Sequence, residues 1–101
     1  MRHGLKFVLL YWLNSPEYTE VVKTGLQRLE EVKEVEDLVV GTPSDIVDDV
    51  IVAEYDVAAV ISFREESDFP VIFQSEQHLS IGKYIHDHQL AKNMQGFMIR
   101  Y

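Results

Sequence analysis

The clearest β-strand of the chain is Tyr55-Asp56-Val57-Ala58-Ala59-Val60-Ile61-Ser62-Phe63-Arg64. A second run of this kind is Leu5-Lys6-Phe7-Val8-Leu9-Leu10-Tyr11-Trp12-Leu13. Both runs are rich in β-branched, aromatic or small apolar residues, which favour strands. In both runs apolar side chains occupy odd and even positions, so a sheet built from them is apolar on both faces. Helices on one face would leave the other face uncovered.

The segment from Ser15 to about residue 34 is predicted to be helical. Ser15 can cap a helix, and Pro16 suits its first turn. Apolar residues then recur at spacings of three and four, which makes one apolar stripe. Gly25 falls on or beside this stripe. Two interpretations stay open: a tolerated glycine, or a close approach of the helix to the sheet.

The middle of the chain supplies a short strand and an acidic connection. Residues 37–42 are predicted to form the strand. Residues 43–54 carry several aspartates between apolar residues and are predicted to be irregular. An extension of the following strand over 50–53 is the alternative.

The last third of the chain contains the second helical region. Ser67 is the predicted cap of a short helix that reaches Phe73, and a longer helix follows over 76–93. Gly96 is expected to end this helix before a last strand, 97–101.

The predicted order is therefore β-α-β-β-α-β in a single domain of residues 1–101. This is the ferredoxin-like α+β arrangement, in which a four-stranded antiparallel sheet carries its helices on one face. We expect the open face to be buried against the same face of a second copy, as in a dimeric α/β barrel. The alternative is that the acidic connection folds over that face.

Composition narrows the classes of partner. Seventeen acidic residues stand against nine basic ones, which gives a net charge of -8. Such a surface repels nucleic acid and anionic lipid, and no apolar run is long enough to span a membrane. The chain has no cysteine, which is compatible with a reducing cytoplasm and excludes thiolate metal sites. No export signal is predicted after the apolar residues near the start.

Together these segments resemble the stress-responsive α/β-barrel (Dabb) family. The resemblance rests on the strand 6–13, on Val40-Gly41-Thr42-Pro43-Ser44, and on Tyr55 to Phe63 followed by His78. It covers nearly the whole chain and implies a ferredoxin-like fold and a dimeric barrel. It does not imply one activity, since most members have none assigned, although a plant member cyclises a polyketide without a cofactor.

The chain departs from the family pattern in three places. A His-Pro-x-His motif often precedes the long second helix, and here the stretch is Ser75-Glu76-Gln77-His78, so only the second histidine is kept. Lys6 stands where the cyclase has a histidine in its first strand. An Asp-Tyr pair near the end is replaced by Arg100-Tyr101. These differences argue against a copied cyclase mechanism.

His78 is the candidate catalytic residue. On a helix it shares a face with Ile81, Ile85 and His88, so its imidazole is predicted to point toward the sheet. Burial without a carboxylate partner favours the neutral ring, which can act as a general base. The structural alternative is a core histidine hydrogen-bonded to a backbone carbonyl or to a tyrosine.

Tyr11, Trp12 and Tyr84 are the candidate ligand-binding residues, since they could line a pocket between helix and sheet. The alternative is that these aromatic residues belong to the core. For Trp12 a further alternative is the dimer interface, since the sequence does not show which face of the sheet it occupies. No metal site is predicted, because His86 and His88 are two positions apart on a helix and point in different directions. No cofactor is predicted either.

Three functions remain open from the sequence. The first is a dimeric protein that binds a small apolar organic ligand, with cofactor-free acid–base chemistry at His78 if it is an enzyme. The second is a non-catalytic, stress-related structural dimer. The third is a cyclase-like or monooxygenase-like enzyme.

Overall fold

The computed structural model describes residues 3–52 and 54–101, and its centre is one four-stranded antiparallel sheet. The strands lie in the order β2-β3-β1-β4. Their bounds are β1 Leu5–Leu13, β2 Asp37–Gly41, β3 Val57–Phe63 and β4 Ala91–Arg100. The first strand therefore lies between the third and the last, which confirms the predicted ferredoxin-like α+β fold.

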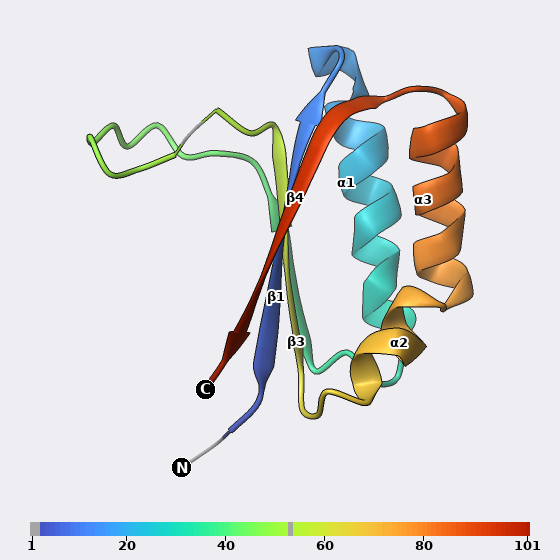
Figure 1. The fold of residues 1–101 in the computed structure, drawn as a ribbon. Helices are drawn as coiled ribbons and strands as arrows, with labels where there is room; N and C mark the ends of the chain where they lie inside the picture. Colours follow the sequence, from blue (N-terminus) through green and yellow to red (C-terminus); the bar gives the residue numbers. More distant parts are fainter. Residues whose placement is uncertain (1–2, 53) are drawn as a thin grey trace.

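All the helices lie on one face of this sheet (Figure 1). Their bounds are α1 Thr19–Gln27, α2 Asp68–Phe73 and α3 Glu76–Asp87. Short 3-10 turns, Pro16–Tyr18 and Arg28–Glu31, precede and follow α1. Ser15 begins the first of these turns, since its hydroxyl accepts a hydrogen bond from Glu17 N at 3.4 Å. Within the described residues, no helix is long and apolar enough to cross a bilayer.

The core lies between the helices and one face of the sheet. Alternate residues of β1 and β3 point into it, and both central strands are deeply buried on this side. The helices contribute their apolar stripes, in which Val22, Leu26, Ile72, Ile81 and Ile85 are buried. Because alternate residues of β1 and of β3 point into the core, a shift of the strands by one residue would expose the core side chains, and this fixes the register of the sheet.

The opposite face of the sheet is apolar and carries no helix. The strand register aligns Val39 with Val60, Val60 with Val8, and Val8 with Phe97. One apolar row therefore crosses all four strands. At the two edges, Val39 is 58% exposed and Phe97 is 48% exposed. Single exposed apolar side chains are common on monomers, but a continuous row marks an interaction surface.

The connection between β2 and β3 does not cover this face. It contains no helix or strand in its described residues, as predicted, and the alternative of a strand over Val50–Val52 is not seen. Figure 1 shows the connection extending away from the sheet on the side opposite the helices. Val47 is 93% exposed and Val50 is 87% exposed. The alternative in which this segment folds over the open face is therefore wrong.

The end of the second helical region was predicted wrongly. The helix stops at Asp87 instead of reaching residue 93, because Gln89 adopts a φ of 52°. Gln89 N then donates to His86 O, and Leu90 N donates to Ile85 O at 3.0 Å, which closes a Schellman motif without glycine.

Gly96 consequently lies inside β4, not at a helix end. It pairs with Leu9 across the sheet, and the ring of Phe7 lies over it, so that a Cβ on residue 96 would come within 2.6 Å of Phe7 Cζ. β4 starts at Ala91, six positions before the predicted strand, and all its residues except Lys92 pair with β1.

Candidate functional site

A cavity of about 520 Å³ lies between α3 and the edge of the sheet formed by β1 and β4. Such a volume suits a small organic ligand. Ten residues line it: Tyr11, His78, Gly82, Ile85, His86, Gln89, Ala91, Lys92, Asn93 and Met94. The cavity extends along α3, since the axial rise of a helix separates His78 from His86 by about 12 Å.

The turn between α2 and α3 positions His78. Ser75 caps α3: its hydroxyl accepts a hydrogen bond from His78 N at 3.2 Å and donates to Ile72 O at 2.6 Å. The imidazole ring packs against the ring of Phe73, with 4.3 Å between the centroids. Local contacts therefore hold this side chain on the cavity wall.

A backbone carbonyl fixes the tautomer of His78. The ring Nδ1 lies 3.0 Å from Phe73 O. A carbonyl oxygen only accepts, so Nδ1 carries the hydrogen, and the neutral ring has its free lone pair on Nε2. Burial lowers the pKa of His78 below its usual value, although the bond to Phe73 O partly opposes this shift. His78 is therefore neutral at pH 7, with Nε2 available as a proton acceptor.

Tyr11 supplies a hydroxyl group to the same cavity. Its side chain comes from the helix-covered face of β1 and is only 3% exposed. Burial raises the pKa of Tyr11 to about 12. The phenol therefore keeps its proton at neutral pH and can donate it in a hydrogen bond.

The structure brings Tyr11 and His78 together but places Trp12 and Tyr84 elsewhere. Trp12 follows Tyr11 directly in β1, so its side chain points to the open face of the sheet. Tyr84 is on the side of α3 that meets α1, where it lines a separate shallow groove with Val21. Neither residue lines the cavity that contains His78. Tyr84 therefore does not line the predicted pocket, and of the two faces left open for Trp12 it occupies the one without helices.

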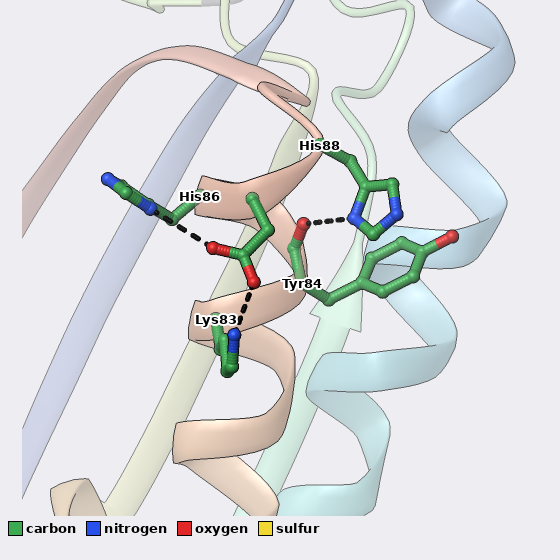
Figure 2. Close-up of polar contacts among 5 residues, drawn as sticks. Lys83, Tyr84, His86 and His88 are labelled. Carbon is green, nitrogen blue, oxygen red and sulfur yellow. Dashed lines mark hydrogen bonds and ion pairs between the residues drawn. The ribbon is translucent and has the colours of Figure 1, made fainter.

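The side chains of His86, in the last turn of α3, and His88, just after it, point to opposite sides (Figure 2). His88 stacks on Tyr84, with 4.2 Å between the ring centroids, and its Nδ1 lies 3.1 Å from Tyr84 O. His88 is exposed. The prediction that it lies on the buried face of α3 with Ile81 and Ile85 is therefore wrong. The helix ends before His88, which explains the difference.

His86 contacts Asp87, whose other carboxylate oxygen pairs with Lys83 (Figure 2). These two partners lower the pKa of the Asp87 carboxyl, to which the hydrogen bond from Lys83 contributes most. Among the residues that the structure describes, no three histidines or carboxylates are grouped to hold a metal ion.

Sequence reasoning missed the part of the cavity wall formed by 89–94. Gln89, Lys92, Asn93 and Met94 were assigned to the helix or left without a role, because no glycine or proline marks the helix end. The polar dipeptide Lys92-Asn93, unusual inside a strand, was the available signal.

Comparison with known proteins identifies the fold. No family model matches the sequence, and no curated protein matches it either. Among solved structures, a dimeric ferredoxin-like protein of unknown function from Thermobifida fusca is similar over 100% of this chain and 93% of its own. It has a TM-score of 0.78 and 18% sequence identity.

Two further structures are similar over nearly their whole length. A Dabb family protein with a ferredoxin-like fold from Mesorhizobium loti has a TM-score of 0.69 at 10% identity, covering 97% of this chain and 96% of its own. The hydroxynitrile lyase of Passiflora edulis has a TM-score of 0.72 at 15% identity, covering 99% of this chain and 94% of its own. At these identities the similarity establishes the fold, and the activity has to be argued from the site.

Proposed function

We propose that this protein binds a small, largely apolar carbonyl compound in the cavity between α3 and the sheet, and that His78 acts there as a general base without a cofactor. One observation carries the proposal: His78 lines the cavity, and the bond from Nδ1 to Phe73 O leaves Nε2 as the free acceptor of its neutral imidazole. A base positioned in this way fits proton abstraction beside a carbonyl group.

The proposed chemistry needs two groups. Nε2 of His78 takes a proton from the carbon next to the carbonyl group, and the electron pair of that C–H bond forms the enolate. The negative charge collects on the carbonyl oxygen, where the neutral hydroxyl of Tyr11 donates a hydrogen bond. The proton then returns from His78 to the carbon or to the oxygen, so the step needs no oxidant or metal.

Two comparisons support this proposal. The sequence resembles the Dabb family, and a Dabb protein shares the fold. A hydroxynitrile lyase also shares the fold, so this architecture is able to hold a catalytic site. Neither similarity transfers an activity to this chain, so the argument depends on His78 and Tyr11.

The test is a thermal-shift screen of small aryl ketones against the wild type, His78→Gln and Tyr11→Phe. A ligand of the cavity raises the melting temperature of the native protein. We expect stabilisation of the wild type, a weaker effect in both variants, and no change in the control His88→Gln. Equal stabilisation of the wild type and both variants would refute the role of His78 and Tyr11.

Exchange of ketone α-hydrogens for deuterium, followed by NMR, tests the chemistry directly. The wild type is expected to accelerate exchange, and His78→Gln is expected to lose that acceleration. A protein that binds ketones through His78 and does not accelerate exchange would be a binding protein and not an enzyme.

We also propose a homodimer formed through the open face of the sheet. The apolar row from Val39 to Phe97 supports it, as do solved neighbours described as dimeric. The β2–β3 connection extends on this same side, so its exposed apolar residues, Val47 and Val50, would meet the second copy. Closed two-fold pairing is the commonest way to bury such a face.

Light scattering after size-exclusion chromatography tests the dimer. Val60→Lys places a charge in the middle of the apolar row and is expected to give monomers at micromolar concentration. Leu79→Lys is the matched control, since Leu79 is 56% exposed on α3. A monomeric wild type would overturn the proposal.

The alternative is a non-catalytic dimer that acts under stress as a structural protein. The cavity and the tautomer of His78 argue for a ligand, whereas the apolar face is compatible with both functions. If His78→Gln only lowers stability and no ketone binds, the structural function is favoured. The absence of cysteine fits a protein that works in the cytoplasm.

A further inference from the structure

The cavity has a local charge opposite to that of the whole protein. The chain has an excess of acidic residues and a net charge of -8. The residues that line the cavity nevertheless include one lysine, two histidines and no carboxylate. In an acidic protein, a wall that contains a lysine and no carboxylate attracts anions that the remaining surface repels.

Lys92 is the cation in this wall, and it has no acidic partner among residues 3–52 and 54–101. Five other cations in these residues pair with carboxylates: Lys23, Arg28, Arg64, Lys83 and Arg100. Lys6 donates to Ser62 Oγ at 2.7 Å on the open face. The ammonium group of Lys92 is therefore available for a ligand.

The strand geometry sets Lys92 apart from its neighbours. The register between β1 and β4 shifts at this point: Leu13 pairs with Ala91 and Trp12 pairs with Asn93, which leaves Lys92 as the extra residue of a bulge. Bulges redirect side chains and occur often beside functional sites. This irregularity lies at the end of the cavity that also contains His86 and Gln89.

We propose that the ligand of the cavity is an anion, an aryl keto acid whose carboxylate binds Lys92 while its carbonyl group lies at His78 and Tyr11. This inference rests on the proposed function and names its substrate class. Tyr11 pairs with Met94, and Lys92 is two residues farther along β4, or about 7 Å away. A ligand with a carbonyl group and a carboxylate on opposite sides of one aromatic ring could therefore reach Tyr11 and Lys92 at the same time.

The experiment compares 4-acetylbenzoate with its neutral analogue 4-acetylbenzamide by isothermal titration calorimetry. Lys92 is exposed, so the wild type is expected to bind the carboxylate about twofold to fivefold more tightly, the range for one exposed ion pair. Lys92→Gln is expected to abolish this preference, and Lys92→Arg to retain it. Lys33→Gln is the control, because Lys33 is exposed between α1 and β2 and does not line the cavity. Added salt should weaken binding of the carboxylate only.

The outcomes separate this inference from the proposed function. If the wild type binds both compounds equally, or if Lys92→Gln keeps the preference, the inference is wrong. If the inference about Lys92 fails but the wild type still binds the amide, and His78→Gln weakens that binding, the proposed function is retained. If neither compound binds the wild type, both proposals are rejected for aryl ketones.

Discussion

Gly25 of α1 and Ile81 of α3 are in direct contact where the two helices cross. A Cβ on residue 25 would lie 2.2 Å from Ile81 Cδ1, closer than any two carbon atoms can pack. Gly25 was predicted to be either tolerated or needed for an approach to the sheet. The close approach is real, but its partner is α3. The contact sets the position of the helix that carries His78.

Gly25→Ala is therefore expected to destabilise the protein. Overpacking of this kind costs about 1–3 kcal/mol in the free energy of unfolding, which outweighs the better helix propensity of alanine. Urea unfolding measures the loss, and Ile81→Val in the same chain should recover part of it. Gly82→Ala is the control, since a Cβ there meets no atom within 4 Å and is expected to stabilise α3. If both alanine variants are stabilised, the contact with Ile81 is not close.

Gln89→Gly is expected to stabilise the protein by about 1 kcal/mol. Gln89 has a φ of 52°, which costs a residue with a side chain about 1–2 kcal/mol compared with glycine. Part of this gain is lost because glycine is more flexible in the unfolded chain. Urea unfolding again provides the measurement, and Gln89→Val should be less stable than the wild type. A destabilised glycine variant would show that the Gln89 side chain makes a contribution larger than the backbone strain.

Protonation of His78 is expected to make stability depend on pH. Its pKa is lowered in the folded protein, so the unfolded chain binds the proton more readily. The stabilisation is complete above the unfolded pKa of about 6.5 and is lost as the pH falls through the lower pKa of the folded state. Unfolding curves between about pH 8 and about pH 5 should therefore show a steeper loss for the wild type than for His78→Gln. Parallel curves would contradict the burial of this imidazole.

Tyr11 is expected to make the stability of the protein depend on pH in the alkaline range. Burial favours the neutral phenol, so the pKa of Tyr11 in the folded state is about 12. The resulting stabilisation of the folded state is complete below the pKa of the unfolded chain. It is lost as the pH rises from the unfolded pKa to the folded pKa. The difference in ultraviolet absorbance between the wild type and Tyr11→Phe isolates this one titration. We expect its midpoint to lie above the usual tyrosine value of about 10. A midpoint at the usual value would mean that the hydroxyl is fully hydrated.

The sequence allowed β1, β2 and β3 to be predicted closely, but for the edge strand β4 only the second half was predicted. β1 and β3 consist of strongly β-prone residues, whereas β4 begins with Ala91, Lys92 and Asn93, which favour other structures. Pairing with β1 overrides this local preference. The helix end was missed for a related reason, because its left-handed residue is a glutamine.

The candidate site was predicted in part. Helical spacing correctly placed His78 on the inward side of α3, since it lines the cavity with Ile85. Strand alternation puts the consecutive residues Tyr11 and Trp12 on opposite faces of the sheet, but which face the helices cover depends on the fold. The position of Tyr84 depends on the packing of α1 against α3, which the sequence pattern of one helix does not contain. Lys92 depends on a bulge, which is a property of two paired strands.

The central position of β1 has a consequence for how the chain folds. Its two neighbours are β3 and β4, so one of its edges stays unsatisfied until the residues of β4 arrive. Pairings between segments so distant in sequence form slowly, because a large loop must close before they give any stabilisation. During synthesis on the ribosome, the apolar side chains of β1 therefore stay exposed until most of the chain has been made. During synthesis this strand is the segment most in need of a chaperone.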